Sequence, residues 1–460
     1  MPPTPPDVIR VPPVQRVFHA QPAPPASKSI TNRALPLAAL ARGASTLRNV
    51  LFADDTRYMI GALQQLGFSL ALDEAEKTIR VAGTGGEIPA RTGELFCGNS
   101  GTTIRFLAAI LAASPGDYRL DGDERMRRRP IGELVEAIAS LGGQARCLER
   151  AGYPPLAVGA AGWAGGTCRF TQTLSSQYIS AILLAAPLAR RPVRVALAGP
   201  VTSEPYVRMT LTMMEQFGVR CRMRAENAAP PAARPEAPAD AEAPAEAAIR
   251  DCVIHVPVDQ PYQPRDYRIE PDASNAGYFL AAAALIPGAS VTIRGLGRNS
   301  MQGDVLFADV LYQMGAAMFM DTAMVRITGR DRLRGLTINM NAIPDMVQTL
   351  CVLALFADSP TRITGVGNLR IKETDRLAAL QTELTKLGAR VITTADGITV
   401  FPPREIRPAR IATYDDHRMA MAFAVAGLRV PGVEIENPGC TAKTYPEFFT
   451  DFLAMTAAAR

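Results

Sequence analysis

The hydrophobic and polar positions of the chain follow one pattern that recurs six times. Each copy starts with a cluster of small polar residues and continues into a helix-length run rich in Ala and Leu. A strand-like stretch follows, and most copies add a second helix with an LG-type ending and more strand. The copies lie about 70 to 75 residues apart, a longer period than that of common solenoid repeats. The sixth copy is shortened after the strand VEIEN, and the six clusters begin at Ser27, Asn99, Ser175, Asp272, Pro344 and Asp415.

The runs that follow the clusters, such as ALPLAALA, FLAAAALI and AMAFAVAG, are apolar on every side. Helices of this kind lie inside a domain, whereas an amphipathic second helix such as IGELVEAIASLGG lies on its surface. Six copies divide into two groups of three. We therefore predict an α/β protein of two similar lobes, each with buried central helices and outer sheets. A cleft between two lobes is a preferred place for a small-molecule site, so we expect the active site there.

The gap between the third and fourth copies is longer than the others because it contains an Ala-, Pro- and Glu-rich stretch, Ala225–Ala248. This stretch has almost no large apolar residue and cannot bury a face. We therefore expect a disordered surface insertion without a catalytic role. The boundary between the lobes is expected in the Pro-containing polar connector Pro261–Arg268, just before the fourth copy.

Composition and charge narrow the class of partner. The chain has 460 residues, 48% hydrophobic and 20% charged, which is the balance of a globular protein with more than one domain. Its net charge of +5 is only mildly basic, and the one dense basic run is Arg125–Arg129. Nucleic-acid binders usually concentrate basic residues in one patch or tail. The scattered Arg and Lys residues therefore favour small anionic substrates over nucleic acid.

The cysteines and the apolar stretches indicate the cellular compartment in which the protein is expected. The seven cysteines are odd in number and widely spaced, and no CxxC occurs, which argues against a disulfide framework or a zinc site. We expect reduced, mostly buried thiols in a cytoplasmic protein. The Pro-rich start of the chain lacks the apolar core of a secretory signal. The most apolar stretch, Ala276–Ile286, is too short to span a bilayer, so no membrane association is expected.

The polar clusters lie where helices begin. A helix start carries unsatisfied N–H groups and a partial positive charge, and it readily binds anions. The alternative is that Ser, Asn and Asp only cap these helices. Capping leaves unexplained a set of charged residues beside wholly apolar helices, since buried charges need partners: Lys28, Arg33, Arg105 and Arg418. The clusters therefore predict a protein that binds small anionic ligands where its Ala-rich helices begin.

Three further segments are dense in ionisable groups: NLRIKETDR, YDDHR and GCTAKTYP. In the first, Lys372, Glu373 and Arg376 lie within one or two helical turns, so several of them can face the same side. The second carries His417, one of only three histidines, and the third carries Lys443 in a loop. A solvated, charged helix start is the alternative interpretation of the first two segments.

Nine segments follow one another in the order SKSITNRALPLAAL, GNSGTTIRFLAA, DERMRRRPI, SSQYISAILLAAPL, SEPYVRMTL, IPDM, NLRIKETDRL, DDHRMAMAFA and CTAKTYPEFF. In this order the chain resembles the family of 5-enolpyruvylshikimate-3-phosphate synthases (3-phosphoshikimate 1-carboxyvinyltransferases). The resemblance spans Ser27 to Phe449, nearly the whole chain. It implies two lobes of three βαβαββ-type units each. The first lobe would hold residues 22–264, and the second would hold residues 1–21 and 265–460, so that the chain crosses near Gln21 and Arg265.

The resemblance also implies a reaction. Family members transfer the enolpyruvyl group of phosphoenolpyruvate to the 5-hydroxyl of shikimate 3-phosphate and release phosphate, a step of the shikimate pathway that leads to chorismate and the aromatic amino acids. No metal and no organic cofactor is implied. The expected partners are the two small-molecule substrates, and the family suggests a monomer.

Site residues follow from the resemblance position by position. Contacts to shikimate 3-phosphate are implied for Lys28, Ser29, Arg33, Ser175, Ser176, Gln177, Ser203, Asp345, Asn368 and Lys372. Contacts to phosphoenolpyruvate are implied for Lys28, Asn99, Gly101, Arg125, Gln177, Arg376, Arg418 and Lys443. Catalytic roles are implied for Asp345, Glu373, Lys28, Lys372 and His417.

The chemistry requires one base and one acid, because the attacking alcohol loses a proton while the methylene carbon gains one. Asp345 beside Lys372 is expected to stay ionised and act as the base. Glu373, shielded in a closed cleft, is expected to hold a proton and donate it. Arg376 and Arg418 can each bind a carboxylate with two parallel hydrogen bonds, which a Lys cannot. Closure of the lobes would expel water and strengthen these contacts.

A few positions depart from the family pattern. Ala26 replaces the Gly common before SKS, and Ser100, Thr103 and Phe106 change the surroundings of Gly101. Gly101 itself leaves room in the phosphoenolpyruvate pocket, where an Ala would crowd a slightly longer inhibitor. We therefore expect this chain to be a glyphosate target.

Two alternatives remain open. The sister enolpyruvyl transferase that acts on UDP-N-acetylglucosamine shares the lobe design, but its first motif has Lys-Asn where this chain has Lys28-Ser29, and no cysteine here matches its loop cysteine. The other alternative is a non-catalytic anion-binding or RNA-end-processing relative. The presence of Asp345, Glu373 and Lys443 together with Lys28 argues against a loss of catalysis.

Overall fold

Six small sheets of mixed strand direction organise the molecule, which was obtained as a computed structural model that describes residues 6–171, 173–225 and 249–460. Within these residues five sheets have four strands and one has three. The mixed α/β class predicted from the repeats is confirmed. Of the predicted insertion, Ala225 is the last residue of a strand, and residues 226–248 lie outside the described residues.

The second copy of the repeat shows the arrangement. Its strand β6 lies parallel to β7, β7 is antiparallel to β9, and β9 is antiparallel to β8. In chain order the elements are β6 (Thr92–Phe96), α3 (Gly101–Ala112), β7 (Pro115–Asp121), α4 (Gly132–Ser140), β8 (Gln144–Cys147) and β9 (Leu156–Ala161). The sheet order is therefore β6-β7-β9-β8.

The third and fifth copies repeat this order of strands and helices. The third comprises β10 (Gly166–Thr171), α5 (Ser176–Ala185), β11 (Val193–Pro200), α6 (Glu204–Gln216), β12 (Arg222–Ala225) and β13 (Arg250–Val256). The fifth comprises β18 (Thr337–Asn339), α9 (Val347–Ala354), β19 (Thr361–Thr364), α10 (Arg376–Lys386), β20 (Arg390–Thr394) and β21 (Gly397–Phe401).

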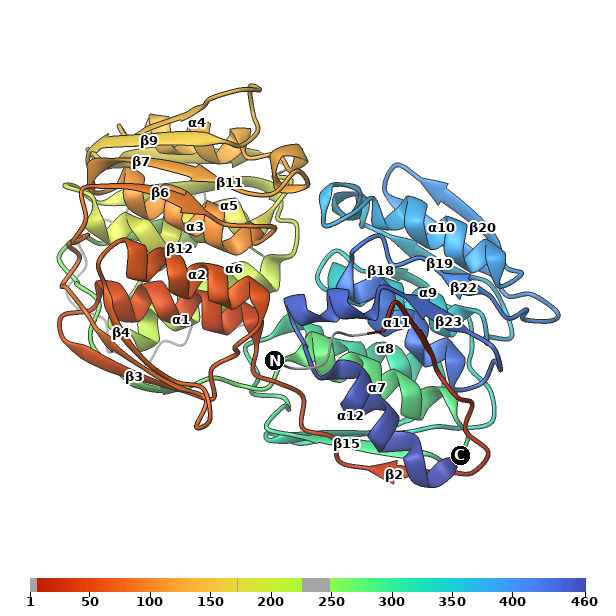
Figure 1. Ribbon diagram of the computed structural model, residues 1–460. Helices are drawn as coiled ribbons and strands as arrows, with labels where there is room; N and C mark the ends of the chain where they lie inside the picture. Colours follow the sequence, from red (N-terminus) through yellow and green to blue (C-terminus); the bar gives the residue numbers. More distant parts are fainter. Residues whose placement is uncertain (1–5, 172, 226–248) are drawn as a thin grey trace.

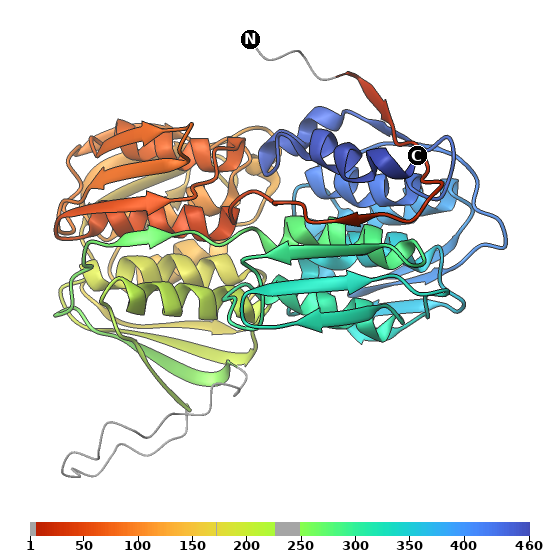
Figure 2. The same cartoon turned by 90° about the horizontal axis from the view of Figure 1, so that it is seen from below.

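The first and fourth copies exchange their first strands. Strand β2 (His19–Ala20) precedes α1 in sequence but pairs in parallel with β15 of the fourth copy, whereas β14 (Asp266–Arg268) precedes α7 but pairs in parallel with β3 of the first. Figure 2 shows both strands lying in the sheet of the other part of the chain. The remaining elements are α1 (Lys28–Leu40), β3 (Ala44–Arg48), α2 (Asp54–Gln65), β4 (Ser69–Asp73) and β5 (Thr78–Ala82), then α7 (Ala273–Leu285), β15 (Ser290–Arg294), α8 (Phe307–Gln313), β16 (Ala317–Met320) and β17 (Met324–Thr328).

The sixth copy is the short one. It provides β22 (Arg410–Ile411), α11 (His417–Gly427) and β23 (Glu434–Glu436), and α12 (Phe448–Thr456) follows. Its third strand is β1 (Val8–Arg10) from the beginning of the chain, which pairs antiparallel with β23. The backbone N–H groups of Gln15 and Arg16 both donate to the Ala459 oxygen, at 2.7 and 2.9 Å, so both ends of the chain are attached to this copy.

Two separate hydrophobic cores result. The first includes buried residues from Ala26 to Ile269, and the second includes Val11, Phe18 and residues from Ala273 to Ala459. We call the parts of the molecule built on these cores the first half and the second half; Figure 1 shows them side by side. Every residue of α3, α7, α9 and α11 is buried, because these apolar helices contact their neighbours on all sides.

The two connections between the halves lie next to each other. The Ser27 N–H donates to the Glu270 oxygen and the Asp272 N–H donates to the Pro25 oxygen, both at 2.8 Å. These bonds pair the segment before α1 with the segment before α7. The starts of one central helix of each half are thereby held together.

Other sequence expectations concern small features of the chain. All seven cysteines are free. In the described ranges no helix is long and apolar enough to cross a membrane. Over the same ranges, His, Cys, Asp and Glu form no group of three or more that could hold a metal ion.

Candidate active site

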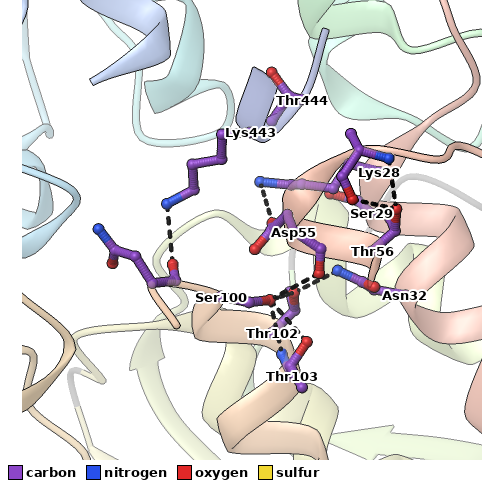
Figure 3. A network of polar contacts seen from close by, with 12 residues as sticks. Lys28, Ser29, Asn32, Asp55, Thr56, Ser100, Thr102, Thr103, Lys443 and Thr444 are labelled. Carbon is purple, nitrogen blue, oxygen red and sulfur yellow. Dashed lines mark hydrogen bonds and ion pairs between the residues drawn. The ribbon is translucent and has the colours of Figure 1, made fainter. Parts of the chain in front are cut away.

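The start of α1 carries an ion pair. Ser27 caps the helix and accepts from the Ile30 N–H at 3.4 Å, which leaves Lys28 at its first position. The Lys28 Nζ lies 3.2 Å from Oδ2 of the buried Asp55, and its backbone N–H donates to Asp272 at 3.1 Å. Figure 3 shows the Lys28 side chain directed at Asp55. The charge of Lys28, which is partly exposed, thus has a partner on α2, a residue that the sequence interpretation missed.

One partly open cavity of about 40 Å³ brings the predicted shikimate 3-phosphate residues together. All ten of them line it, although they come from three different repeats. The sequence interpretation missed two more lining residues, Thr102 and Tyr206. The full lining is Lys28, Ser29, Arg33, Thr102, Ser175, Ser176, Gln177, Ser203, Tyr206, Asp345, Asn368 and Lys372.

Protein contacts fix the hydroxyl and amide side of this cavity. Ser175 caps α5, and its Oγ accepts from the Gln177 N–H at 3.3 Å. The Gln177 Oε1 accepts from Nη1 of Arg105 at 2.5 Å. Ser203 has a left-handed backbone with φ of 55°, and its N–H donates to the Asn341 oxygen of the second half at 3.1 Å. The polar groups are therefore oriented before any ligand arrives.

Arg33 is buried behind the cavity wall. Its Nε donates to Thr210 at 2.8 Å, its Nη1 to the Ser29 oxygen at 2.9 Å and its Nη2 to Ser180 at 3.3 Å, and the guanidinium lies 5.2 Å from the Phe106 ring centre. Burial lowers the pKa of Arg33 to about 10, so it stays charged at neutral pH. All three nitrogens are engaged, and the Nη1 bond directly orders Ser29.

Asp345 lies in the short 3-10 helix η4 (Pro344–Met346) and faces three cations. Its carboxylate is 2.8 Å from Arg418 Nη2, 3.1 Å from Arg376 Nη1 and 3.6 Å from Lys372 Nζ. Burial alone would raise its pKa, but Arg418 and the other cations hold the pKa of Asp345 well below its ordinary value. The ionised state predicted from the sequence fits these surroundings.

Glu373 also lies among cations. Its Oε2 is 2.9 Å from Arg376 Nη2, and its Oε1 is 3.3 Å from Lys443 Nζ and 3.9 Å from Arg129 Nη1. Burial favours the neutral acid, yet Lys443, Arg376 and Arg129 together lower the pKa of Glu373 well below its ordinary value. The expectation that Glu373 holds a proton in the closed cleft does not fit this state, because the cations stabilise its carboxylate.

Asp416 fixes the two arginines expected to bind a carboxylate. It caps α11 and accepts from the Arg418 N–H at 2.9 Å, and it receives two bonds from Arg376, at 2.7 and 3.2 Å. His417 between them is buried, and in the described structure neither ring nitrogen has a hydrogen-bond partner. Burial and the Arg418 charge hold the pKa of His417 well below its ordinary value, so the ring is neutral.

The start of α3 meets the C-terminal loop. The Asn99 oxygen accepts from Lys443 Nζ at 2.9 Å and from Arg129 Nη1 at 3.1 Å, and Figure 3 shows Lys443 reaching down to this contact. Arg125 donates to the Lys372 oxygen through Nε at 3.0 Å and Nη2 at 2.5 Å. A methyl group added to Gly101 would lie 2.7 Å from Arg129 Nη2. Through these contacts Asn99 and Arg125 of the first half are joined to Lys443 and Lys372 of the second half.

The sequence interpretation missed Arg129, Asp55 and Asp416 in this network. Arg129 belongs to the same basic run as Arg125, and it was passed over because a run of arginines does not show which of them face inward. Asp416 stands at a predicted helix start and Asp55 in the first turn of α2, where capping is the ordinary explanation of an acidic residue. Charge balance was the available signal, since a buried arginine such as Arg376 requires carboxylate partners.

Comparison with known proteins places this geometry in context. The chain matches the family model of EPSP synthase (3-phosphoshikimate 1-carboxyvinyltransferase) over residues 19–233 and 246–452. It is 42% identical over 449 residues to a 3-phosphoshikimate 1-carboxyvinyltransferase of Trichormus variabilis, covering 98% of this chain and 99% of that protein. It is 44% identical over 433 residues to the one of Edwardsiella ictaluri, covering 94% and 95%.

Solved structures share the fold. EPSP synthase from Acinetobacter baumannii matches with a TM-score of 0.76 at 23% identity over 98% of both chains. The enolpyruvyl transferase NikO from Streptomyces tendae matches with a TM-score of 0.72 at 17% identity, over 97% of this chain and 96% of that one.

Proposed function

Since the chain belongs to the EPSP synthase (3-phosphoshikimate 1-carboxyvinyltransferase) family, we propose how its buried polar network carries out the reaction of that family. The chain transfers the enolpyruvyl group of phosphoenolpyruvate to the 5-hydroxyl of shikimate 3-phosphate in the shikimate pathway. In our proposal the 40 Å³ cavity widens to hold shikimate 3-phosphate between Ser29, Ser175, Ser176 and Ser203. The phosphoenolpyruvate lies beside it, against the network around Asn99.

The phosphoenolpyruvate subsite is defined by its cations. Arg376 and Arg418 bind the carboxylate, and Arg125, Lys28 and Lys443 bind the phosphate. Arg376 and Arg418 are presented by the starts of α10 and α11, and their present partners are carboxylates. A substrate carboxylate can replace Asp345 at these arginines, and a guanidinium can bind such a carboxylate with two parallel hydrogen bonds. Asn99, Gly101 and Gln177 complete the subsite with backbone and amide groups.

Asp345 acts as the base for the 5-hydroxyl. A carboxylate held by three cations is a weak base, so its proton affinity must rise when the substrates bind. Two anionic substrates provide this change, because they share the charge of Arg418, Arg376 and Lys372 with Asp345. Lys372 and Asn368 hold the shikimate ring next to Asp345.

Glu373 delivers the proton to the methylene carbon by the same principle. In the network described above Lys443 and Arg376 stabilise its carboxylate. When phosphoenolpyruvate takes these cations, Glu373 loses its ion-pair partners and its pKa rises towards that of a buried acid. His417, neutral and buried behind Arg418, is in this scheme a neighbour that keeps water out rather than a proton donor.

The two halves act as lobes that open and close. The proposed lobes are residues 22–264 and residues 1–21 with 265–460. A cavity of about 40 Å³ holds a few water molecules, not a sugar phosphate, so the lobes must separate before substrate enters. We further propose that the enzyme works as a cytoplasmic monomer, because one chain supplies every proposed site residue and all seven cysteines are free.

The observation that carries the proposal is the convergence of all ten predicted residues on one cavity. A phosphate-release assay with both substrates, each omitted in turn, tests the reaction. Phosphate should appear only when phosphoenolpyruvate and shikimate 3-phosphate are both present. Release with a UDP-amino sugar in place of shikimate 3-phosphate would instead favour the sister transferase.

A further inference from the structure

A buried carboxyl outside the proposed chemistry lies between the two halves. Asp304 belongs to the short 3-10 helix η3 (Gly303–Leu306) of the second half and is buried. Its Oδ2 accepts from the Tyr206 hydroxyl at 3.0 Å and from the Ser274 hydroxyl in a shorter bond. Its Oδ1 has no hydrogen-bond partner in the described part of the chain. A buried charge with one unsatisfied oxygen is costly, so its presence calls for an explanation.

The bond from Tyr206 crosses between the halves. Tyr206 lies on α6 of the first half and lines the same cavity as Ser203. The approach of η3 to α6 is close: a methyl group added to Gly303 would lie 2.4 Å from Cβ of Pro205. Only a glycine at position 303 lets Asp304 come within reach of Tyr206, and this contact forms only when the halves meet.

The hydrogen bond from Ser274 connects Asp304, through Arg418, with the proposed base Asp345. The Ser274 Oγ lies 3.4 Å from Arg418 Nη2, and the same nitrogen donates to Asp345 at 2.8 Å. A guanidinium can only donate, so Ser274 accepts from Arg418 and must direct its own proton elsewhere. Asp304 is the acceptor of that proton. The carboxylate of Asp304 therefore determines how Ser274 presents itself to Arg418.

We infer that Asp304 is a positioning residue that connects Tyr206 on the shikimate 3-phosphate side with Ser274 and Arg418 on the phosphoenolpyruvate side when the halves close. It touches neither substrate. Through Ser274 it holds Arg418 in the orientation that pairs with Asp345, and through Tyr206 it makes this orientation depend on closure. The inference rests on the roles proposed above for Asp345 and Arg418.

The charges around Asp304 give the connection a pH dependence. Burial raises the pKa of Asp304 to about 6, and Asp345 and Asp272 add to the rise, whereas Arg418 and the Ser274 bond oppose it. Burial raises the pKa of Tyr206 well above its ordinary value, so Tyr206 remains a donor. As the pH falls below about 6, Asp304 gains a proton and no longer needs both hydroxyl donors. The connection therefore weakens on the acid side.

Stability provides a readout that separates positioning from a structural role. The pKa of Asp304 in the folded protein lies above its ordinary value of 3.8, so the folded state binds the extra proton. Its ionisation therefore destabilises the fold as the pH rises through this window. Asp304→Asn should consequently keep or raise the melting temperature at pH 8. If Asp304 served only to stabilise the fold, Asp304→Asn would instead lower the melting temperature at pH 8.

The experiment compares Tyr206→Phe, Asp304→Asn and the double variant, with Tyr312→Phe and Asp309→Asn as matched controls. Tyr312 is exposed, and Asp309 lies on α8 outside the cavity lining. Each single variant at the connection should lower kcat by roughly tenfold to a hundredfold, as expected for a lost hydrogen bond to a charged group. The double variant should be no slower than the slower single variant, because both remove one connection. The controls should match the wild type.

Two outcomes would overturn the inference. In the first, the kcat of both single variants equals that of their controls. In the second, the loss of kcat in the double variant is the full sum of the two single losses in free energy. If Asp304→Asn does not fold, Tyr206→Phe decides alone: an unchanged kcat, or an acid limb near pH 6 identical to that of Tyr312→Phe, counts against Asp304. Asp345→Ala, assayed in parallel, tests the proposed function separately. If this variant kept its turnover, the proposed base would be refuted, but the coupling between Tyr206 and Asp304 could still be measured.

Discussion

The side chain of Lys443 ends 2.9 Å from the backbone oxygen of Asn99, so a loop near the C-terminus contacts the start of a buried helix in the first half. The same amine lies 3.3 Å from Glu373. Lys443 therefore contacts an acid from the second half and a backbone acceptor from the first. Its position depends on the distance between the halves.

Replacement of Lys443 by Met should weaken the binding of phosphoenolpyruvate and shift the pH profile of kcat. Loss of a buried cation from an anion site raises KM for phosphoenolpyruvate by roughly tenfold to a thousandfold. Lys443 is also the strongest of the charges that lower the pKa of Glu373, the proposed proton donor, so the alkaline limb of kcat should move to higher pH. Steady-state kinetics from pH 5 to 9 measure both effects. Lys386→Met is the control, since Lys386 pairs with Glu383 instead.

Asp345→Ala should lower turnover by roughly a hundredfold or more while substrate binding is largely kept, because the 5-hydroxyl loses its base. Single-turnover measurements with both substrates at saturation report this step. Asp331→Ala, an exposed residue of the second half, should behave as the wild type. Near-normal turnover of Asp345→Ala would refute the assigned base.

Glu373→Gln should also lose roughly a hundredfold in turnover, since the amide cannot supply the proton. Binding of phosphoenolpyruvate should be unchanged or tighter, because one negative charge disappears beside Lys443 and Arg376. Titration calorimetry in the presence of shikimate 3-phosphate measures the binding. Exposed Glu405 provides the matched control as Glu405→Gln. A wild-type rate for Glu373→Gln would mean that another group protonates the methylene carbon.

Gly101→Ala should discriminate between substrate and inhibitor. The new methyl group would lie 2.7 Å from Arg129 Nη2 and 2.8 Å from Arg105 Nη1, and both arginines are buried and hydrogen-bonded, so they cannot move freely. Crowding of this kind costs about 1–3 kcal/mol. KM for phosphoenolpyruvate should rise about tenfold, and glyphosate, which is slightly longer, should lose more. A wild-type inhibition constant in the millimolar range would contradict the expected sensitivity.

The stability of the folded protein should decrease in acid. The pKa values of Asp345 and Glu373 are lowered, so the stability that they contribute is present above their ordinary values of 3.8 and 4.5 and is lost as the pH falls through the folded values. His417 acts in the same direction, because the unfolded chain protonates it near pH 6.5 and the buried ring resists. Asp304 opposes this loss between about pH 6 and its ordinary value of 3.8, so melting temperatures between pH 8 and 3 should fall most steeply below about pH 4. A flat profile down to pH 3 would contradict these shifts.

Much of the fold follows from periodicity. The six apolar runs predict six buried helices, because burial on every side leaves a clear pattern. The exchange of β2 and β14 between the two halves leaves no such pattern in the sequence. These strands have two and three residues, too few for an alternating pattern. Only their hydrogen bonds to β15 and β3 reveal where they belong.

The candidate site could likewise be predicted from the sequence only in part. Local motifs such as SKS and NLRIKETDR could be recognised, since the chemistry of each lies in adjacent residues. Partners from distant segments could not. Asp55 beside Lys28 and Asp304 beneath Tyr206 become visible only when separate repeats pack together. The lowered pKa of Glu373 in the described structure was missed for the same reason, because it depends on Lys443, which is 70 residues further along the chain.

The paired connections before α1 and α7 have a mechanical consequence. Two parallel links, bonded through Ser27 to Glu270 and through Asp272 to Pro25, allow bending about one axis but resist twisting and sliding. A circular permutant that joins the original ends and opens after Pro264 would place residues 265–460 and 1–21 in one continuous stretch and leave a single link. Such a molecule would keep all its side chains but gain rotational freedom. Its loss of catalytic rate would measure how much of the enzyme's precision comes from chain connectivity alone.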